Sequence, residues 1–361
     1  MKRYTRLLCR AYQELGWQVI LASPPSKLSS RTSSAHLRKW ISYVEKFIWF
    51  PWVAKYQIRG ADILHVADHS DAIWLLQLGQ RTPALVTCHD LIAVRAALGE
   101  IPLVRIDPLG RIYQRLVLAG LQRAWRVASV STETASDVER LTRATAHLLP
   151  NPLDPSLDGV LGSSSQSSEA RRPYLLVVSS VGYRKRREKS VHAWSRLGST
   201  ATLHGAGLVI VGPPLTADED QSVPQHSRDR IMELHNVSDA ELSELYRGCA
   251  ATLVLSQYEG FGWPIVESQA HGKVPLVTDD PVFRSTGGDG AVYVDPEQFE
   301  SFGQDAWESL ARQLTDERVA GAARRNVERY RWPDFKRNLC EVVGSSLSPE
   351  RADQGAVRAR R

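Results

Sequence analysis

The sequence predicts an α/β protein built from two parallel-sheet domains. Short apolar runs rich in β-branched residues alternate with helical segments from one end of the chain to the other, which is typical of strands buried on both faces of a sheet. A Ser/Gly-rich stretch, residues 158–169, interrupts this alternation and has the composition of a linker. The chain has 361 residues, 43% of them hydrophobic, which is enough for two domains with separate cores.

The first half of the chain is expected to begin with an amphipathic helix over residues 2–15. Helical segments then separate the strands, which are expected at residues 17–21, 61–67, 84–88 and 126–131.

The second half is expected to contain six strands, at residues 174–179, 208–212, 231–235, 252–256, 274–278 and 291–294. Ser238 and Glu241 form a capping box that opens a helix ending near Cys249. The predicted organisation is an amino-terminal domain (1–157), a linker (158–172), a carboxyl-terminal domain (173–330), a crossover helix (331–348, centred on 333–345) and a disordered polar tail (349–361).

Composition excludes several classes of protein. The four cysteines are far apart and form no C-x-x-C pair, so neither a disulfide framework nor a thiolate zinc site is expected, and a reducing cytoplasm fits. No run of about 18 apolar residues could span a bilayer, and the amino terminus lacks the pattern of a secretory signal. We therefore expect a soluble or peripheral protein.

The positive charge is concentrated at the amino terminus. Residues 1–60 hold 11 Lys or Arg against two Glu, a balance of +9, so the rest of a chain with a total of +5 carries −4. Cations mixed with aromatic residues favour contact with an anionic membrane, and they also fit a folded core with a solvated rim. Nucleic acid is disfavoured, since no recognition motif accompanies the charge. The aromatic and apolar residues concerned are Trp40, Ile41, Phe47, Ile48, Trp49, Phe50 and Trp52.

The segment from Glu259 to Glu267 carries the strongest functional signal. It follows the expected strand 252–256, so Glu259 falls just past the carboxyl end of that strand, where open α/β sheets bind ligands. Glu267 would lie one turn into the following helix and could reach a vicinal diol such as that of a ribose. The spacing alone also fits two ordinary surface charges around a turn.

The residues between the two glutamates suit close approach of a ligand. Gly260 and Gly262 lack side chains where the backbone would face the ligand, and Pro264 suits the first turn of a helix expected over residues 264–271. The free N–H groups of that turn would point at a diphosphate. This segment therefore predicts a nucleotide-sugar pocket.

The full string EGFGWPIVE, followed by SQAHGKVPLV, resembles the signature of the retaining glycosyltransferases of family four. The resemblance implies the GT-B fold, in which two Rossmann-like parallel-sheet domains face each other across a cleft. It also implies that Glu259 contacts the donor sugar, that Glu267 binds the ribose and that the amides of Phe261 and Gly262 bind sugar hydroxyls. The nucleotide sugar is then a substrate, and no cofactor or metal ion is expected.

Two cations follow the first strand of the second domain. Arg184 and Lys185 stand at the same sheet edge as the Glu259 loop, and GT-B enzymes stabilise a departing diphosphate with cations and helix ends in place of a metal. The family has Arg-Lys-Asn or Arg-Lys-Gly here, which implies that Lys185, together with Arg184, binds the diphosphate. The alternative is a solvated charge run. Arg186 and Arg187 are expected to stay on the surface.

In the first domain, His89 and Asp90 stand at the carboxyl end of strand 84–88. Their Thr-x-His-Asp segment is similar to one in the family, which implies that His89 reaches the donor sugar or positions the acceptor, with Asp90 on the acceptor side. A lone histidine is also common as a structural group. His65 and His69 have no third ligand at a suitable spacing and are interpreted as structural.

The chain departs from the family in three places. Relatives begin with a strand and a glycine-rich loop ahead of the first helix, so the first strand of the amino-terminal domain is expected to be missing, through a late start codon or a true truncation. Its loss would expose a sheet flank and remove amides that face the donor phosphates. An arginine common near Ser179 is absent, and residues 283–286 lack the acidic residue that relatives carry there.

The resemblance implies a retaining, metal-independent hexosyltransferase, with His89, Lys185 and Glu259 as the catalytic set. The Arg-Lys motif with EGFG is most similar to bacterial mannosyltransferases that use GDP-mannose. The acceptor is expected to be a polysaccharide or lipid-linked glycan of the cell envelope, handled in the cytoplasm at the inner face of the membrane. The alternative is a non-catalytic nucleotide-sugar-binding paralogue or partner subunit. A sugar phosphorylase is disfavoured, because no cofactor lysine site is present.

Overall fold

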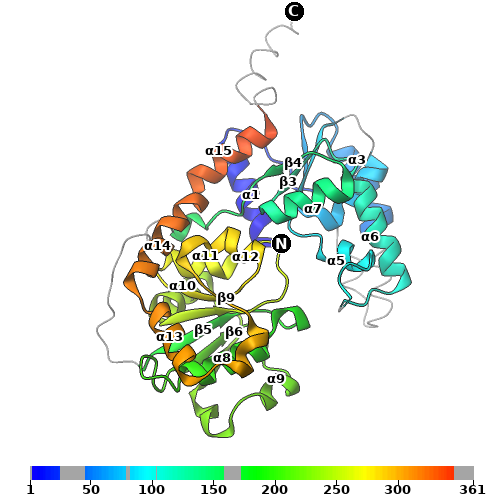
Figure 1. The fold of residues 1–361 in the computed structure, drawn as a ribbon. Coiled ribbons are helices and arrows are strands. Elements are labelled where there is room, and N and C mark those ends of the chain that lie inside the picture. The colour runs from blue at the N-terminus through cyan, green and yellow to red at the C-terminus, as the bar shows by residue number, and fades with distance from the viewer. Residues whose placement is uncertain (1, 25–44, 79–81, 103, 158–171, 345–361) are drawn as a thin grey trace, which may run out of the picture. The chain divides into compact units, whose positions relative to one another are not determined.

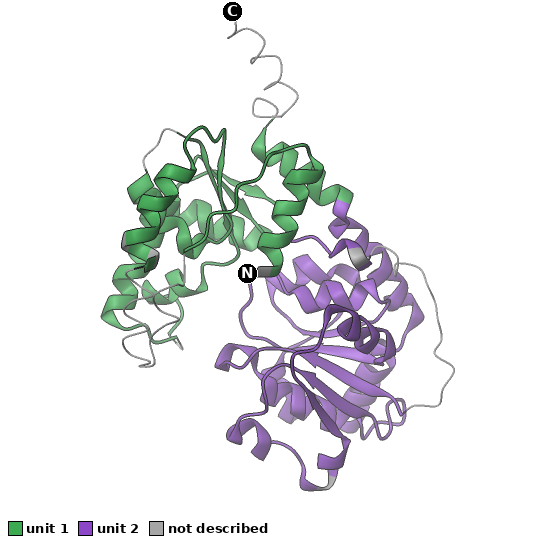
Figure 2. Ribbon diagram, turned by 180° about the vertical axis from the view of Figure 1, so that it is seen from behind, with its two compact units in different colours: residues 1–150, 333–361 green, residues 151–332 purple. Residues whose placement is uncertain are grey.

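The computed structural model describes residues 2–24, 45–78, 82–102, 104–157 and 172–344 (Figure 1). The chain divides into two compact units, described here one at a time. Unit 1 comprises residues 1–150 and 333–361, and unit 2 comprises residues 151–332 (Figure 2). The expected linker, except for residue 172, and the expected disordered tail lie outside the described residues.

Unit 2 is built around a six-stranded parallel sheet, which confirms all six strands expected from the sequence. The strand order is β10-β9-β8-β5-β6-β7, so the order reverses between the neighbours β5 and β8. In open α/β sheets, ligands bind outside the carboxyl ends of the two strands where the order reverses. The strands are β5 (Tyr174–Val178), β6 (Gly207–Val211), β7 (Ile231–Leu234), β8 (Ala251–Val254), β9 (Pro275–Thr278) and β10 (Val292–Val294).

Helices cover both faces of this sheet, because alternate residues of each strand point to opposite sides. Leu175 of β5 packs in a cluster with Trp194 and Trp307, whereas its neighbour Leu176 packs with Tyr246 on the other face. The helices of unit 2 are α8 (Arg187–Leu197), α9 (Ala217–Gln221), α10 (Asp239–Gly248), α11 (Trp263–Ala270), α12 (Pro281–Gly287), α13 (Gln304–Leu314) and α14 (Glu317–Val327). The predicted capping box of Ser238 and Glu241 opens α10.

Unit 1 contains a four-stranded parallel sheet in the order β1-β2-β3-β4. Its strands are β1 (Leu64–Val66), β2 (Ala84–Cys88), β3 (Arg126–Ser129) and β4 (Ala146–Leu148), and Val86 of β2 packs in one cluster with Val117 and Val138. The helices are α1 (Lys2–Glu14), α3 (Phe50–Gln57), α4 (Leu75–Leu78), α5 (Ile92–Ala97), α6 (Pro108–Leu121), α7 (Thr132–Thr142) and most of α15 (Trp332–Val343).

The amino-terminal helix α1 forms because apolar residues recur every three or four positions and face one side. Tyr4, Leu7, Leu8, Ala11 and Tyr12 are all buried.

Two sequence expectations for unit 1 differ from the structure. The strand expected at residues 17–21 is wrong: this segment forms no strand, and Ile20 and Leu21 are each 65% exposed. An alternating apolar pattern forms a strand only when a neighbouring strand supplies backbone partners, and among the described residues none pairs with this segment. The short edge strand β4 was not predicted, because its three residues are only partly covered and carry little pattern.

Among the residues that the structure describes, no helix has both the length and the apolar character needed to cross a membrane.

Candidate functional site

The loops after β5 and β8 meet at the carboxyl edge of the unit 2 sheet. The backbone N–H of Gln257, after β8, donates to the carbonyl of Arg184, after β5, at 2.7 Å. The Lys185 ammonium group forms an ion pair with Oε1 of Glu259, and their side chains are 19% and 17% exposed. The structure therefore brings together Lys185, which is predicted to bind the diphosphate, and Glu259, which is predicted to contact the sugar. They meet at the point where the strand order reverses.

The loop after β5 is shaped by a short 3₁₀ turn, Tyr183–Lys185, between Gly182 (φ 152°) and Arg186 (φ 46°). Glycine adopts a positive φ freely, whereas a positive φ is unusual for a residue with a side chain such as Arg186. The turn carries Arg184 and Lys185 and is followed at once by α8. The Arg184 side chain is half-buried, and within the described part of the chain it has no ion-pair partner.

Arg187 corrects one sequence expectation. It was expected on the surface, yet its side chain is only 1% exposed. Its guanidinium donates to both carboxylate oxygens of Glu219, at 3.0 and 2.7 Å, and to the carbonyls of Pro213 and Pro214, at 2.7 and 2.9 Å. The planar fork of arginine satisfies such a set in full, which makes its burial tolerable. Arg186 lies nearer the surface, 15% exposed, and pairs with Glu297 at 2.7 Å.

The loop after β8 leads into α11 through Gly262, which has φ 89° and caps the helix. A Cβ at this glycine would lie 2.9 Å from Ile265 Cδ1 and 3.3 Å from the ring of Phe283, and its positive φ would strain any residue with a side chain. Thr286 Oγ1 donates to the carbonyl of Phe261 at 2.7 Å, and this hydrogen bond fixes the turn. In the first turn of α11, Pro264 has no N–H, and the N–H of Ile265 donates to the carbonyl of Gly262 at 3.0 Å.

Glu267 lies one turn inside α11 and is only 4% exposed. Its Oε2 accepts a hydrogen bond from the Tyr246 hydroxyl at 2.8 Å. The ring of Tyr246 stacks on His271 with centroids 5.3 Å apart. A buried carboxylate needs such donors, because an unpaired charge in the interior is costly.

His271 extends this chain of hydrogen bonds, and it was not identified from the sequence. Its Nδ1 donates to the Glu267 carbonyl at 2.8 Å, so its Nε2 accepts from the Ser243 hydroxyl at 2.8 Å. Burial lowers the pKa of His271, which favours this neutral form. The contacts join α10 to α11 and hold the helix that carries Glu267. Sequence patterns do not reveal them, because they join residues on different helices.

In unit 1, His89 follows β2 directly. Its Nε2 donates to the carbonyl of Ala67 at 3.0 Å, and Tyr4 contacts its ring edge-on with centroids 4.6 Å apart. Burial is the main cause of a lowered pKa, so the ring is neutral at neutral pH. Nδ1 is then left as an acceptor, and within the described residues no hydrogen bond to it is present.

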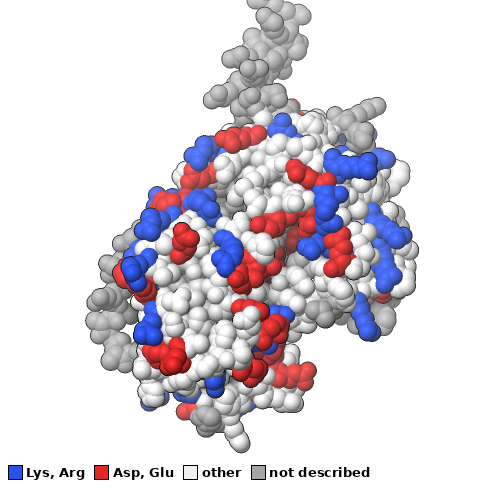
Figure 3. Space-filling view, in the orientation of Figure 1, with Lys and Arg blue, Asp and Glu red and all other residues white. Residues whose placement is uncertain are grey.

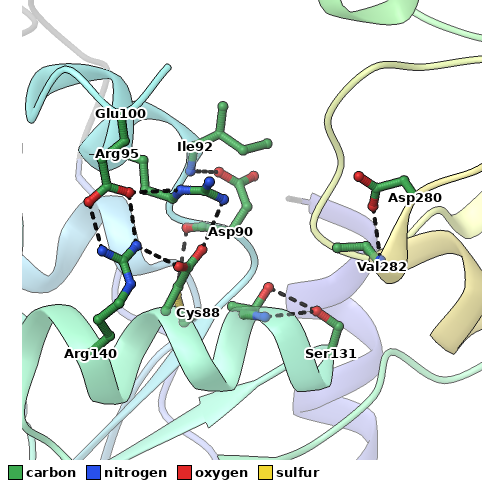
Figure 4. A network of polar contacts seen from close by, with 11 residues as sticks. Cys88, Asp90, Ile92, Arg95, Glu100, Ser131, Arg140, Asp280 and Val282 are labelled. Carbon is green, nitrogen blue, oxygen red and sulfur yellow. Dashed lines mark hydrogen bonds and ion pairs between the residues drawn. The ribbon is translucent and has the colours of Figure 1, made fainter.

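Asp90 supports the start of α5. Its Oδ1 accepts from the N–H of Ile92 at 3.1 Å, as Figure 4 shows. Arg140 donates to both oxygens of Glu100 at 2.7 and 2.9 Å, and these bonds lower the pKa of that carboxyl (Figure 4). This pairing holds the end of the α5 segment against α7. The proposed roles of His89 and Asp90 towards a donor and an acceptor stay predictions.

His65 has both ring nitrogens engaged, by the Tyr12 and Thr87 hydroxyls at 2.8 Å each. It therefore serves as a structural group, as the sequence suggested. Within the described residues, no group of three or more His, Cys, Asp or Glu side chains is placed to hold a metal ion.

Two family models match the chain. Residues 1–157 match the model described as Glycosyltransferase Family 4, and residues 163–326 match Glycosyl transferases group 1.

Curated relatives cover part of the chain. It is 34% identical over 124 residues to the O-antigen chain mannosyltransferase RfbU of Salmonella typhimurium, and 26% identical over 231 residues to the serotype-specific mannosyltransferase WbdA of Escherichia coli. The alignments cover 34% and 58% of this chain. The chain spans less than a third of either relative, 32% and 28%.

Solved structures share the fold over most of the chain. A sucrose-phosphate synthase from Thermosynechococcus elongatus is similar with a TM-score of 0.70 at 18% identity, covering 94% of this chain and 92% of that one. A UDP-forming α,α-trehalose-phosphate synthase from Burkholderia xenovorans is similar with a TM-score of 0.61 at 15% identity, covering 95% and 86%. These similarities show that the two parallel-sheet units have the GT-B fold.

Proposed function

Since the chain belongs to the glycosyl transferases of group 1, with an amino-terminal half of glycosyltransferase family 4, we propose that it moves a hexose from a nucleotide sugar to a glycan. The observation that carries the proposal is the meeting of Lys185 and Glu259 beside the first turn of α11, where the strand order of unit 2 reverses. A cation, a helix end and a carboxylate at one edge suit a diphosphate joined to a sugar.

Different residues of unit 2 bind different parts of the donor. Lys185 and Arg184 hold the diphosphate, and the positive end of the α11 dipole lies at the same edge. Glu259 contacts the sugar, as do the backbone groups from Gly260 to Gly262. Glu267 accepts hydrogen bonds from the ribose hydroxyls, and the Tyr246 hydroxyl holds its carboxylate in place.

The Lys185–Glu259 pair has a consequence for donor binding. In the structure each group satisfies the other, so a diphosphate must draw Lys185 away from Glu259 or share it. When the sugar arrives with the diphosphate, its hydroxyls give Glu259 new donors in place of the lysine. We propose that this exchange favours the complete nucleotide sugar over the bare nucleotide.

The reaction proposed is transfer with retention at the anomeric carbon and without a metal ion. The bond from the anomeric carbon to the diphosphate breaks as the acceptor oxygen bonds on the same face, and the departing diphosphate takes the acceptor's proton. Lys185 and Arg184 stabilise the charge that develops on the diphosphate. His89, neutral and with Nδ1 as an acceptor, would receive a hydrogen bond from a sugar hydroxyl, and Asp90 would act on the acceptor side.

Mannose from GDP-mannose is the donor we propose. Two curated relatives are named as mannosyltransferases, one of an O-antigen chain, and the Arg-Lys and EGFG motifs of this chain led to the same expectation. The acceptor proposed is accordingly a growing cell-envelope polysaccharide or its lipid-linked form, reached from the cytoplasmic side of the membrane.

The basic amino-terminal region is proposed to contact that membrane. Within its described part, Phe50 is buried against Trp74, as a folded core requires, whereas Trp49 and Trp52 are 43% and 74% exposed. Lys55 lies over the Trp52 ring at 5.7 Å. Trp40 and Ile41 lie outside the described residues. Exposed aromatic rings with adjacent cations suit the interface of an anionic bilayer.

Turnover tests the proposal. The full-length protein is incubated with GDP-mannose, UDP-glucose or UDP-N-acetylglucosamine and a lipid-linked glycan fraction, and release of nucleotide is measured together with incorporation of sugar. GDP release coupled to mannose incorporation, lost in Lys185→Ala, is the expected result. Binding of nucleotide without release of sugar from any donor would favour the non-catalytic alternative instead.

A further inference from the structure

Helix α6 of unit 1 exposes an apolar stripe that folding does not explain. Leu109, Ile112 and Leu116 are 76%, 52% and 40% exposed. They stand three and four positions apart, so they lie on one side of the helix. A stripe of large apolar side chains in water is unfavourable, and a contiguous exposed patch of this kind marks a surface that contacts something else.

The side of α6 that adjoins this stripe is fixed to the rest of unit 1. Val117 and Leu121 are fully buried. A Cβ on Gly120 would lie 2.2 Å from the Ala72 carbonyl oxygen, so the two backbones are in close contact. The Tyr113 hydroxyl donates to the carbonyl of Ser70 at 2.7 Å. These contacts hold α6 in place, and within the described residues the stripe of Leu109, Ile112 and Leu116 remains exposed.

Arginines border the stripe. Residues 104–126 contain five arginines and one acidic residue, Asp107, whose side chain caps α6 by accepting from Gly110 N at 2.7 Å. Arg105, Arg111 and Arg115 are exposed, and no carboxylate pairs with them within the described residues. An apolar stripe with a cationic border is the pattern of a helix that lies in the interface of an anionic bilayer, since the arginine stems can extend along the apolar surface towards phosphate.

Helix α3 extends the same flank of unit 1. Phe50 and Ala54 of α3 and Tyr113 of α6 pack into one cluster around Trp74. Both views place α3 and α6 on one flank (Figures 1 and 2), and blue atoms gather over that flank in Figure 3. On its outer side, α3 exposes Trp52 and Tyr56, each 74%.

We propose that the outer α6 face, made of Leu109, Ile112 and Leu116 with Arg111 and Arg115, docks on an anionic lipid surface. A second copy of the chain fits less well, because a two-fold contact would bring the same cationic border against itself. The proposal goes beyond the transfer reaction, since docking requires no turnover.

Vesicle flotation of the full-length protein tests this inference. Vesicles of phosphatidylcholine with phosphatidylglycerol are compared with vesicles of phosphatidylcholine alone. The wild type is expected to float with the anionic vesicles only. Arg111→Gln together with Arg115→Gln should weaken binding about 25-fold, at about fivefold for each cation. Ile112→Ser together with Leu116→Ser should weaken it at least about tenfold, because two apolar side chains no longer enter the bilayer.

Matched variants in unit 2 serve as controls. Arg312→Gln with Arg318→Gln removes the same charge, and Met232→Ser removes an apolar side chain that is 56% exposed. Both should float as the wild type does. All these side chains are on the surface, so thermal unfolding should stay unchanged, and GDP release on a water-soluble acceptor should also stay unchanged, which separates this test from that of the proposed function.

Three results would overturn the proposal. One is equal flotation of the α6 variants and the wild type. Another is loss of binding in Trp52→Ser while both α6 variants bind as the wild type does, which would assign the contact to α3. The third is a wild-type dimer in sedimentation that becomes a monomer in the Ile112→Ser, Leu116→Ser variant, since the face would then be covered by a second copy.

Discussion

The carboxyl edges of the two sheets use their polar side chains differently. In unit 2, Lys185 and Glu259 pair with each other, and both remain partly exposed. In unit 1, His89 donates to the Ala67 carbonyl and Asp90 accepts from the Ile92 N–H, so both are tied to backbone. An ion pair between side chains can be exchanged for contacts with a ligand, whereas a bond to backbone fixes a side chain in place. This difference supports our proposal that the donor exchanges contacts at the edge of unit 2, whereas the side chains at the edge of unit 1 are held in fixed positions.

The largest effect is expected from Glu267→Ala. The buried carboxylate is the proposed acceptor for the ribose hydroxyls, and its loss leaves both those hydroxyls and the Tyr246 hydroxyl without a charged partner. Donor affinity should fall about a hundredfold, close to 3 kcal/mol. Isothermal titration with GDP-mannose measures it, and Glu244→Ala, on the exposed side of α10, should bind as the wild type does. Unchanged affinity of the Glu267 variant would place the ribose elsewhere.

Lys185 and Glu259 should respond in opposite directions. Lys185→Ala should weaken GDP binding about thirtyfold, or about 2 kcal/mol, because a charge-assisted bond to the diphosphate is lost. Glu259→Gln should strengthen binding of bare GDP, since Lys185 is released, while sugar transfer falls. Lys189→Ala, whose partner Glu297 is 59% exposed, is the control for charge. A weaker GDP affinity in Glu259→Gln would contradict the exchange of partners.

Acid should weaken unit 1 through His65. Burial lowers the pKa of this ring to about 3, whereas the unfolded chain binds a proton near pH 6.5. Between these pH values His65 is protonated only in the unfolded state. The contribution of the neutral ring to the free energy of unfolding is therefore complete above about pH 6.5. It is lost as the pH falls towards 3, by about 1.4 kcal/mol per pH unit. Chemical denaturation at pH 7 and pH 5.5 should show this loss. The slope should be shallower in His65→Asn and unchanged in His204→Asn, a histidine on the surface.

The smallest effect is expected from Tyr246→Phe. This variant lacks the hydroxyl that donates a hydrogen bond to Glu267. The KM for the donor should rise about fivefold, or about 1 kcal/mol, with little change in kcat. Tyr293→Phe is the matched control, because it loses a hydroxyl bonded to the Gly288 carbonyl in the same unit. Equal changes of KM in the two variants would mean that Tyr246 acts on stability alone.

Most of the fold followed from the sequence, because buried parallel strands are continuous apolar runs bounded by turns. All six strands of unit 2 were predicted on this basis. The error at residues 17–21 shows the limit of the pattern, since a strand also needs a neighbour. Arg187 shows the same limit for charge: a run of four cations predicts a solvated surface, and only the position of Glu219 reveals the buried pair.

The candidate site could be predicted from the sequence where its residues lie close together in the chain. Glu259, the glycine turn and Glu267 lie within one segment, and Lys185 follows a strand that the sequence predicts. The hydrogen bonds from Ser243 through His271, and from Tyr246 to Glu267, join two helices and become visible only in the fold.

Nucleotide binding to the intact chain tests the central claim most directly. Thermal unfolding is measured with GDP, UDP, ADP and their sugar conjugates at equal concentration, for the wild type and Lys185→Ala, because a ligand that binds only the folded state raises its stability. We predict that GDP and GDP-mannose raise the midpoint of the wild type and have a much smaller effect on the variant. If no nucleotide raises it, or if the two proteins respond equally, the edge of β5 and β8 is not the donor site.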